Sequence, residues 1–126
     1  MIIPYPFNIT TDGSGDYTAT ANRPCNGYLV NVEALDTDLS AGADLTVTAS
    51  GDANSIDVLT EGDFDSDVNY YPRAKACDTS TATIDEGDDT SSFAHWVRLH
   101  VSGLITVTIA NGGDTKTGKV VDWIEE

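Results

Sequence analysis

The chain has 126 residues, 40% of them hydrophobic, and its six Lys and Arg residues stand against 21 Asp and Glu residues, which gives a net charge of −15. This length and apolar content suit one folded domain with a single core and argue against a disordered chain. The negative charge disfavours direct binding to nucleic acid and to anionic membranes, because both contacts need cations on the protein.

The first predicted strand covers residues 2–10, and two prolines interrupt it. Proline lacks the N–H group that a sheet ladder needs. The segment is therefore predicted to be an edge strand of its own domain or an extended arm. As an arm it would contact a neighbouring subunit through its apolar residues Ile2, Ile3, Tyr5 and Phe7. It has no basic region and no long apolar core, so we expect no signal peptide.

Alternation of apolar and polar residues predicts further strands, separated by turns rich in Gly, Asp and Asn. These strands cover residues 16–21, 27–35, 43–50, 55–60 and 93–101. Leu45 and Val47 are expected to point inward, with the residues of 55–60 pairing alongside. Strict alternation in 27–35 places Leu29 and Val32 on opposite faces.

The end of the chain has the strongest β pattern. Residues 104–110 alternate apolar and hydroxyl side chains, and Asn111-Gly112-Gly113-Asp114 supplies turn residues before a returning strand at 116–124. This arrangement predicts a β-hairpin. With about eight strands and no helical pattern, the fold class is all-β: a single-domain antiparallel β-sandwich or small barrel over residues 1–126, with 1–10 as the candidate arm.

No catalytic motif is apparent, and we predict that the protein is not an enzyme and has no cofactor. Asp63, Asp65 and Asp67 alternate as in calcium loops, but Val68 and Ala74 occupy the positions where an EF-hand needs Gly and Glu. A solvated acidic loop is therefore expected, with an irregular calcium site as the alternative.

The histidines and cysteines also lack a recognisable site pattern. His95 and His100 are five residues apart on one predicted strand, so they face opposite sides and form no common metal face. Cys25 and Cys77 are expected to be two reduced thiols, with a disulfide between them as the alternative.

Tyr70, Tyr71 and Arg73, together with Pro72, form the most suggestive cluster for a contact with a partner. Aromatic residues and arginine are enriched at protein interfaces, and this is one of only three arginines in the chain. The alternative is that one tyrosine packs in the core while the other covers an end of the sandwich. Trp96 and Trp123 lie on predicted strands, where a core position is favoured over a sugar-stacking platform.

With these features the chain resembles the small β-sandwich virion proteins of tailed bacteriophages and tailed archaeal viruses. The resemblance rests on the missing signal peptide, the Tyr-Tyr-Pro-Arg segment at 70–73 and the closing hairpin from Gly103 to Gly118 with its Asn-Gly-Gly-Asp turn. It implies a capsid decoration or cement protein, often trimeric, located in the virion after assembly in the host cytoplasm. The implied partners are the major capsid protein or other virion subunits.

Two other functions remain open. One is a module that binds carbohydrate or a host surface, such as a fibre or turret tip, which requires exposed aromatic residues. The other is a head–tail or tail-tube component, which would assemble into rings or tubes rather than trimers. The charge of −15 is expected to reflect either a saline environment, where salt screens self-repulsion, or a crowded assembly that must stay soluble.

Overall fold

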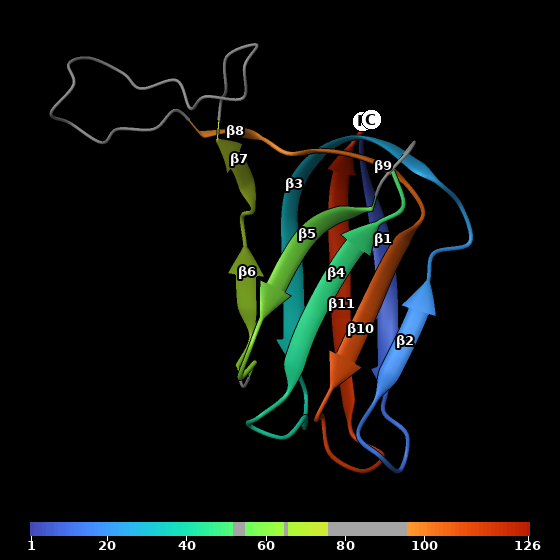
Figure 1. Ribbon diagram of the computed structural model, residues 1–126, viewed down its shortest axis with the longest axis vertical. Helices are drawn as coiled ribbons and strands as arrows, with labels where there is room; N and C mark the ends of the chain where they lie inside the picture. The colour runs from blue at the N-terminus through green and yellow to red at the C-terminus, as the bar shows by residue number, and fades with distance from the viewer. Residues whose placement is uncertain (52–54, 65, 76–95) are drawn as a thin grey trace, which may run out of the picture.

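The computed structural model describes residues 1–51, 55–64, 66–75 and 96–126. Within these ranges the chain forms eleven strands and no helix, which confirms the predicted all-β class. The strands are β1 (Ile2–Thr10), β2 (Tyr17–Thr20), β3 (Cys25–Asp36), β4 (Asp44–Ala49), β5 (Ile56–Glu61), β6 (Val68–Tyr70), β7 (Arg73–Lys75), β8 (Trp96–Arg98), β9 (His100–Gly103), β10 (Ile105–Ala110) and β11 (Thr117–Glu125) (Figure 1).

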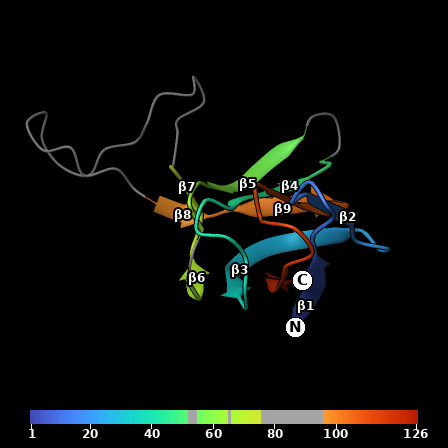
Figure 2. The same ribbon diagram turned by 90° about the horizontal axis from the view of Figure 1, so that it is seen from below.

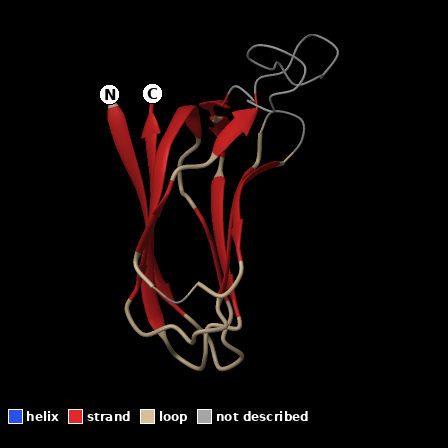
Figure 3. Ribbon diagram, turned by 90° about the vertical axis from the view of Figure 1, so that its left-hand side faces the viewer, coloured by secondary structure: helices blue, strands red, loops and turns tan. Residues whose placement is uncertain are grey.

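Two antiparallel sheets pack against each other as a sandwich. The first sheet has the order β1-β11-β3-β6, and β9 pairs with another part of β3, on the same side of β3 as β6. The second sheet has the order β2-β10-β4-β5. Figure 2 shows the sheets as two layers, and Figure 3 shows both chain ends at the same end of the sandwich. The short pair β7-β8 extends from the first sheet at that end (Figure 1).

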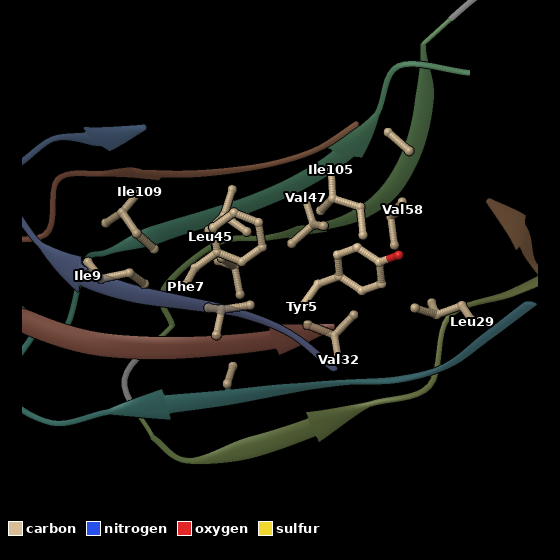
Figure 4. Close-up of a cluster of buried hydrophobic side chains, with 14 of the residues drawn as sticks. Tyr5, Phe7, Ile9, Leu29, Val32, Leu45, Val47, Val58, Ile105 and Ile109 are labelled. Carbon is tan, nitrogen blue, oxygen red and sulfur yellow. The ribbon is translucent and has the colours of Figure 1, made fainter. Parts of the chain in front are cut away.

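The core lies between the two sheets and follows the period of two expected for strands. Side chains from β1, β3, β4, β5 and β10 interdigitate there (Figure 4). The predicted alternation in 43–50 is confirmed, since Leu45 and Val47 are fully buried between half-buried neighbours. Burying each such side chain contributes about 1.5–3 kcal/mol to folding.

The segment 2–10 is an edge strand of its own domain. All nine residues pair in register with β11, from Ile2 opposite Glu125 to Thr10 opposite Thr117. Tyr5 is 3% exposed and Phe7 5% exposed, because both face the core. Their side chains are therefore occupied by their own domain, which corrects the expectation that they contact a neighbouring subunit.

The closing hairpin prediction is wrong. β10 pairs with β2 and β4 in one sheet, whereas β11 pairs with β1 and β3 in the other. The loop between them has six residues and includes positive φ angles at Asn111, Gly113 and Thr115, so it crosses between the sheets instead of reversing within one. One of the features behind the resemblance to virion proteins is therefore absent.

The expected alternation in 27–35 also fails at one point. Asn31 lies opposite Trp123, but the next pair joins Leu29 to Ile124, so Val30 is an extra residue in a β-bulge. The bulge shifts the phase of the strand. As a result Leu29 and Val32 both point into the core.

The predicted strand at 93–101 is two strands, β8 and β9, in the described part of the chain. They are interrupted at Leu99, whose carbonyl accepts a hydrogen bond from the Leu29 N–H at 2.8 Å. Residues 93–95, with His95, lie outside the described residues. Trp123 lies on β11 and is half-buried, while the position of the Trp96 side chain is not among those described.

Candidate functional site

The most distinctive exposed group of side chains lies on the outer face of the first sheet, near the chain ends. Strand β3 runs between β9 and β11 there, and its register places Tyr28 opposite His100 on one side and opposite Glu125 on the other. Residues paired across neighbouring strands share a face. Arg98 and Asn26 complete this group, which we call the Tyr28 cluster.

The cluster is held together by ring and charge contacts. The Tyr28 and His100 rings meet edge to face, with centroids 5.4 Å apart and planes at 77°. The guanidinium carbon of Arg98 lies 5.2 Å from the centre of the Tyr28 ring, and Arg98 also pairs with the Glu125 carboxylate. His100 Nε2 and Asn26 Oδ1 are 3.0 Å apart. These contacts hold the ring of Tyr28 in place while leaving it 47% exposed.

A shallow hollow of about 350 Å³ lies over the cluster. Gly27 forms part of its lining, and a Cβ atom at this position would lie 2.2 Å from the Glu125 carbonyl oxygen. Only glycine permits this close approach of β3 to β11. The hollow thus combines main chain, an exposed aromatic ring and polar side chains.

Below the cluster, Tyr5 and Cys25 lie in the core. The Tyr5 hydroxyl donates to Glu126 Oε1 at 3.1 Å, and burial with this acceptor raises the pKa of Tyr5 to about 12. Burial also raises the pKa of the Cys25 thiol, which is free. A protonated buried thiol is a poor nucleophile, so its position indicates packing. Cys77 lies outside the described residues.

The predicted contact segment 70–73 lies beside this region. Tyr70 is half-buried and packs against the core, which agrees with part of the alternative expectation, whereas Tyr71 is 61% exposed. Arg73 is exposed and lies opposite Arg98 in the β7-β8 pair, with its Nη1 donating to the Pro72 carbonyl at 2.8 Å. Sequence alone did not connect Tyr28 with this segment. The two are brought together by the pairing register of β3, which local sequence patterns do not predict.

Most of the large apolar side chains that are exposed in the described part of the chain belong to elements at the end with both termini, while Tyr71 directly follows β6, whose Tyr70 pairs with Val32 near the middle of β3. We call the end with both termini the terminal end of the sandwich (Figure 3). The exposed large apolar side chains are Met1, Ile2, Tyr28, Tyr71, Val97 and Leu104. Ile3, the remaining predicted contact residue, is half-buried against the core. Exposed apolar and aromatic side chains of the kind predicted to make contacts in 70–73 therefore lie at this end, and they come from parts of the chain that are distant in sequence.

The opposite end, which we call the acidic end, consists of the loops 11–16, 37–43 and 111–116 and the described residues of 62–67 (Figure 1). Main-chain hydrogen bonds join these loops, including Gly112 N to the Gly15 carbonyl at 2.8 Å. Acidic side chains in the loops are Asp12, Asp16, Asp38, Asp63, Asp67 and Asp114.

Two carboxylates at the acidic end are stabilised in their charged form. Main-chain N–H donors of Asp16 and Ser14 lower the pKa of Asp12. The N–H and hydroxyl of Thr117 likewise lower the pKa of Asp38. No three His, Cys, Asp or Glu side chains gather as a metal site in the described ranges, and Asp65 of the predicted acidic loop lies outside them.

No helix long and apolar enough to cross a membrane occurs among the described residues. No protein-family model, curated protein or solved structure matches the chain.

Proposed function

We propose that this protein is a non-catalytic structural domain that attaches to a larger assembly through its terminal end, as a capsid decoration protein attaches to the shell of a tailed virus. The observation that carries the proposal is the two-ended surface. Exposed apolar and aromatic side chains lie at the terminal end, while the opposite end consists of joined acidic loops.

The terminal end has the composition of a contact surface. Tyrosine and arginine dominate the energetics of protein interfaces, and both occur there in Tyr28, Arg73 and Arg98, with Tyr71 two residues before Arg73. Aromatic rings bury a large area at a small cost in side-chain entropy. Repetition of one modest contact over many copies on a shell gives strong overall attachment by avidity.

The acidic end suits the side that faces solvent. Its charges repel the same end of neighbouring copies, and the repulsion disfavours unwanted association. The same proposal includes a trimer bound to the major capsid protein. The contacts are proposed to come from Ile2, Tyr28, Tyr71 and Arg73 instead of the buried side chains of β1.

The first test is sedimentation of material from the native source, followed by detection with an antibody against this chain. We expect co-migration with large DNA-filled particles. In reconstitution with particles stripped of the protein, Tyr71→Ala combined with Arg73→Ala is expected to weaken binding at least tenfold. Asp16→Asn at the acidic end is the matched control and should bind normally. Migration only as a small species would contradict the proposal.

A carbohydrate-binding module is the second candidate, because the hollow over the Tyr28 cluster presents an exposed ring beside amide, imidazole and carboxylate groups. Binding on a glycan array that Tyr28→Ala abolishes, together with a small species on sedimentation, would favour this function over attachment to a shell.

A further inference from the structure

Asp122 is an acidic side chain in the interior of the sandwich, on β11 between β1 and β3. Only 1% of its surface is exposed. Neither carboxyl oxygen has a hydrogen-bond partner among the described residues. Removing a carboxylate from water without a compensating contact strongly favours the neutral acid, and burial raises the pKa of Asp122 to about 7.

The surroundings of the carboxyl group are apolar on the facing sheet. It borders a narrow void that is too small for a water molecule. The other residues lining this void are Leu29, Val47, Val58, Val101, Ile105 and Ile124, which come from β3, β4, β5, β9, β10 and β11. A carboxylate formed here therefore has no hydrogen-bond partner among the described residues.

The titratable groups nearest to Asp122 stay neutral over the range in which it ionises. On β1, Tyr5 lies beside it in register, and its pKa is about 12. On β3, Cys25 interacts with it electrostatically, and burial raises the pKa of that thiol. The facing strands β4, β5 and β10 present valine and isoleucine to the void, and Val101 of β9 lines it from the same sheet as Asp122. The Glu126 carboxylate and the Arg23 guanidinium both lie against Tyr5, at 3.1 Å from its hydroxyl and 4.4 Å from its ring centre, and neither forms an ion pair or hydrogen bond with Asp122 among the described residues.

Strand β5 covers this site from an open edge of the facing sheet. It is an edge strand that pairs only with β4. Its register passes from Leu59 opposite Val47 to Asp57 opposite Thr48, so Val58 is the extra residue of a β-bulge. Val58 itself lines the void beside Asp122. Displacement of this one strand breaks only its pairing with β4 and opens the void beside the carboxyl group to water.

We propose that Asp122 makes the packing of the two sheets a pH-sensitive switch with β5 as its moving part. As the neutral acid, Asp122 packs in the core and β5 stays closed. When the carboxyl group releases its proton to solvent, the carboxylate requires hydration, and the edge strand opens to admit water. This inference does not depend on the proposed attachment to a shell.

The sign of the pH dependence follows from linkage. Because the pKa of Asp122 is higher in the folded chain than its ordinary value of 3.8, the folded state binds more protons than the unfolded state between these two values. Stability is therefore greatest on the acid side of this window and falls as the pH rises through it. One proton changes the folding equilibrium by at most tenfold per pH unit.

The test compares the wild-type chain with Asp122→Asn between pH 5 and 8, by urea unfolding and by amide hydrogen exchange. For the wild type we expect a falling folding constant and about tenfold faster exchange of residues 56–61 at pH 8 than at pH 6, after correction for intrinsic rates. Asp122→Asn should lose both effects. Asp16→Asn, which removes the same charge at the surface, should retain them.

Carbon NMR titration of the wild-type Asp122 carboxyl group gives a second measurement, which stands even if Asp122→Asn does not fold. A transition near pH 7 supports the switch. A transition near pH 4, or identical pH dependence in the wild type and Asp122→Asn, would overturn it.

Discussion

At the residue scale, Gly103 decides how the chain passes from one sheet to the other. It ends β9 in the first sheet, two residues before β10 begins in the second. Its φ of +87° lies in the left-handed region, and a Cβ atom would lie 2.1 Å from Ser50 Oγ and 2.8 Å from the Gly51 nitrogen. The corner therefore requires glycine for two independent reasons, backbone conformation and lack of space.

Gly103→Ala is expected to destabilise the fold by about 1–3 kcal/mol, because alanine disfavours this φ and collides with the neighbouring turn. Equilibrium urea unfolding measures the change. Gly42→Ala is the matched control, since a Cβ atom there meets nothing within 4 Å. An equal effect of the two substitutions would show that the corner is not under this constraint.

At the element scale, the prolines of β1 protect an open sheet edge. Thr11 N donates to the Lys116 carbonyl at 2.9 Å, so odd-numbered residues of this segment direct their main chain toward β11. Even-numbered residues, including Pro4 and Pro6, then direct theirs toward the free edge. Because proline has no N–H, this edge cannot form a complete ladder with another strand.

Replacing Pro4 and Pro6 together with threonine restores two donors to the free edge. We expect greater self-association than in the wild type at equal concentration, detected by light scattering and size-exclusion chromatography. Asn8→Thr changes the same edge without adding a donor and serves as the control. An unchanged association state in the double variant would argue against edge protection.

Deletion of residues 1–7, by contrast, does not test an arm. It would remove Tyr5 and Phe7 from the core, and loss of each large buried side chain costs about 3–5 kcal/mol. Loss of particle binding after this deletion would therefore report unfolding as readily as a lost contact.

At the scale of the whole molecule, negative charge dominates. The net charge is −15, and Arg98–Glu125 is the one ion pair within the described ranges. Unscreened repulsion of this size opposes the compact state.

We expect the melting temperature to rise as sodium chloride increases from low concentration to the molar range, because salt screens the repulsion. Calorimetry measures the shift, and an uncharged osmolyte at equal osmolality separates screening from exclusion of solute. An unchanged melting temperature in salt would count against adaptation of this surface to a saline environment.

The sequence by itself determined the all-β class, the position of most strands and the inward residues of regular strands such as 43–50. These features depend on local chemistry, since period-two alternation, β-branched residues and turn residues act within a few positions. In segment 70–73, one tyrosine is half-buried and the other is exposed. This agrees with the expectation that one of them packs inward.

Only the tertiary structure decided which strands pair, because pairing depends on contacts between distant segments. The sheet crossing of 111–116, the bulge at Val30 and the closure of β1 on β11 were therefore inaccessible to local patterns. The same reason hid the Tyr28 cluster, whose members come from β3, β8, β9 and β11. It also hid the burial of Asp122, which follows from the central place of β11 between β1 and β3.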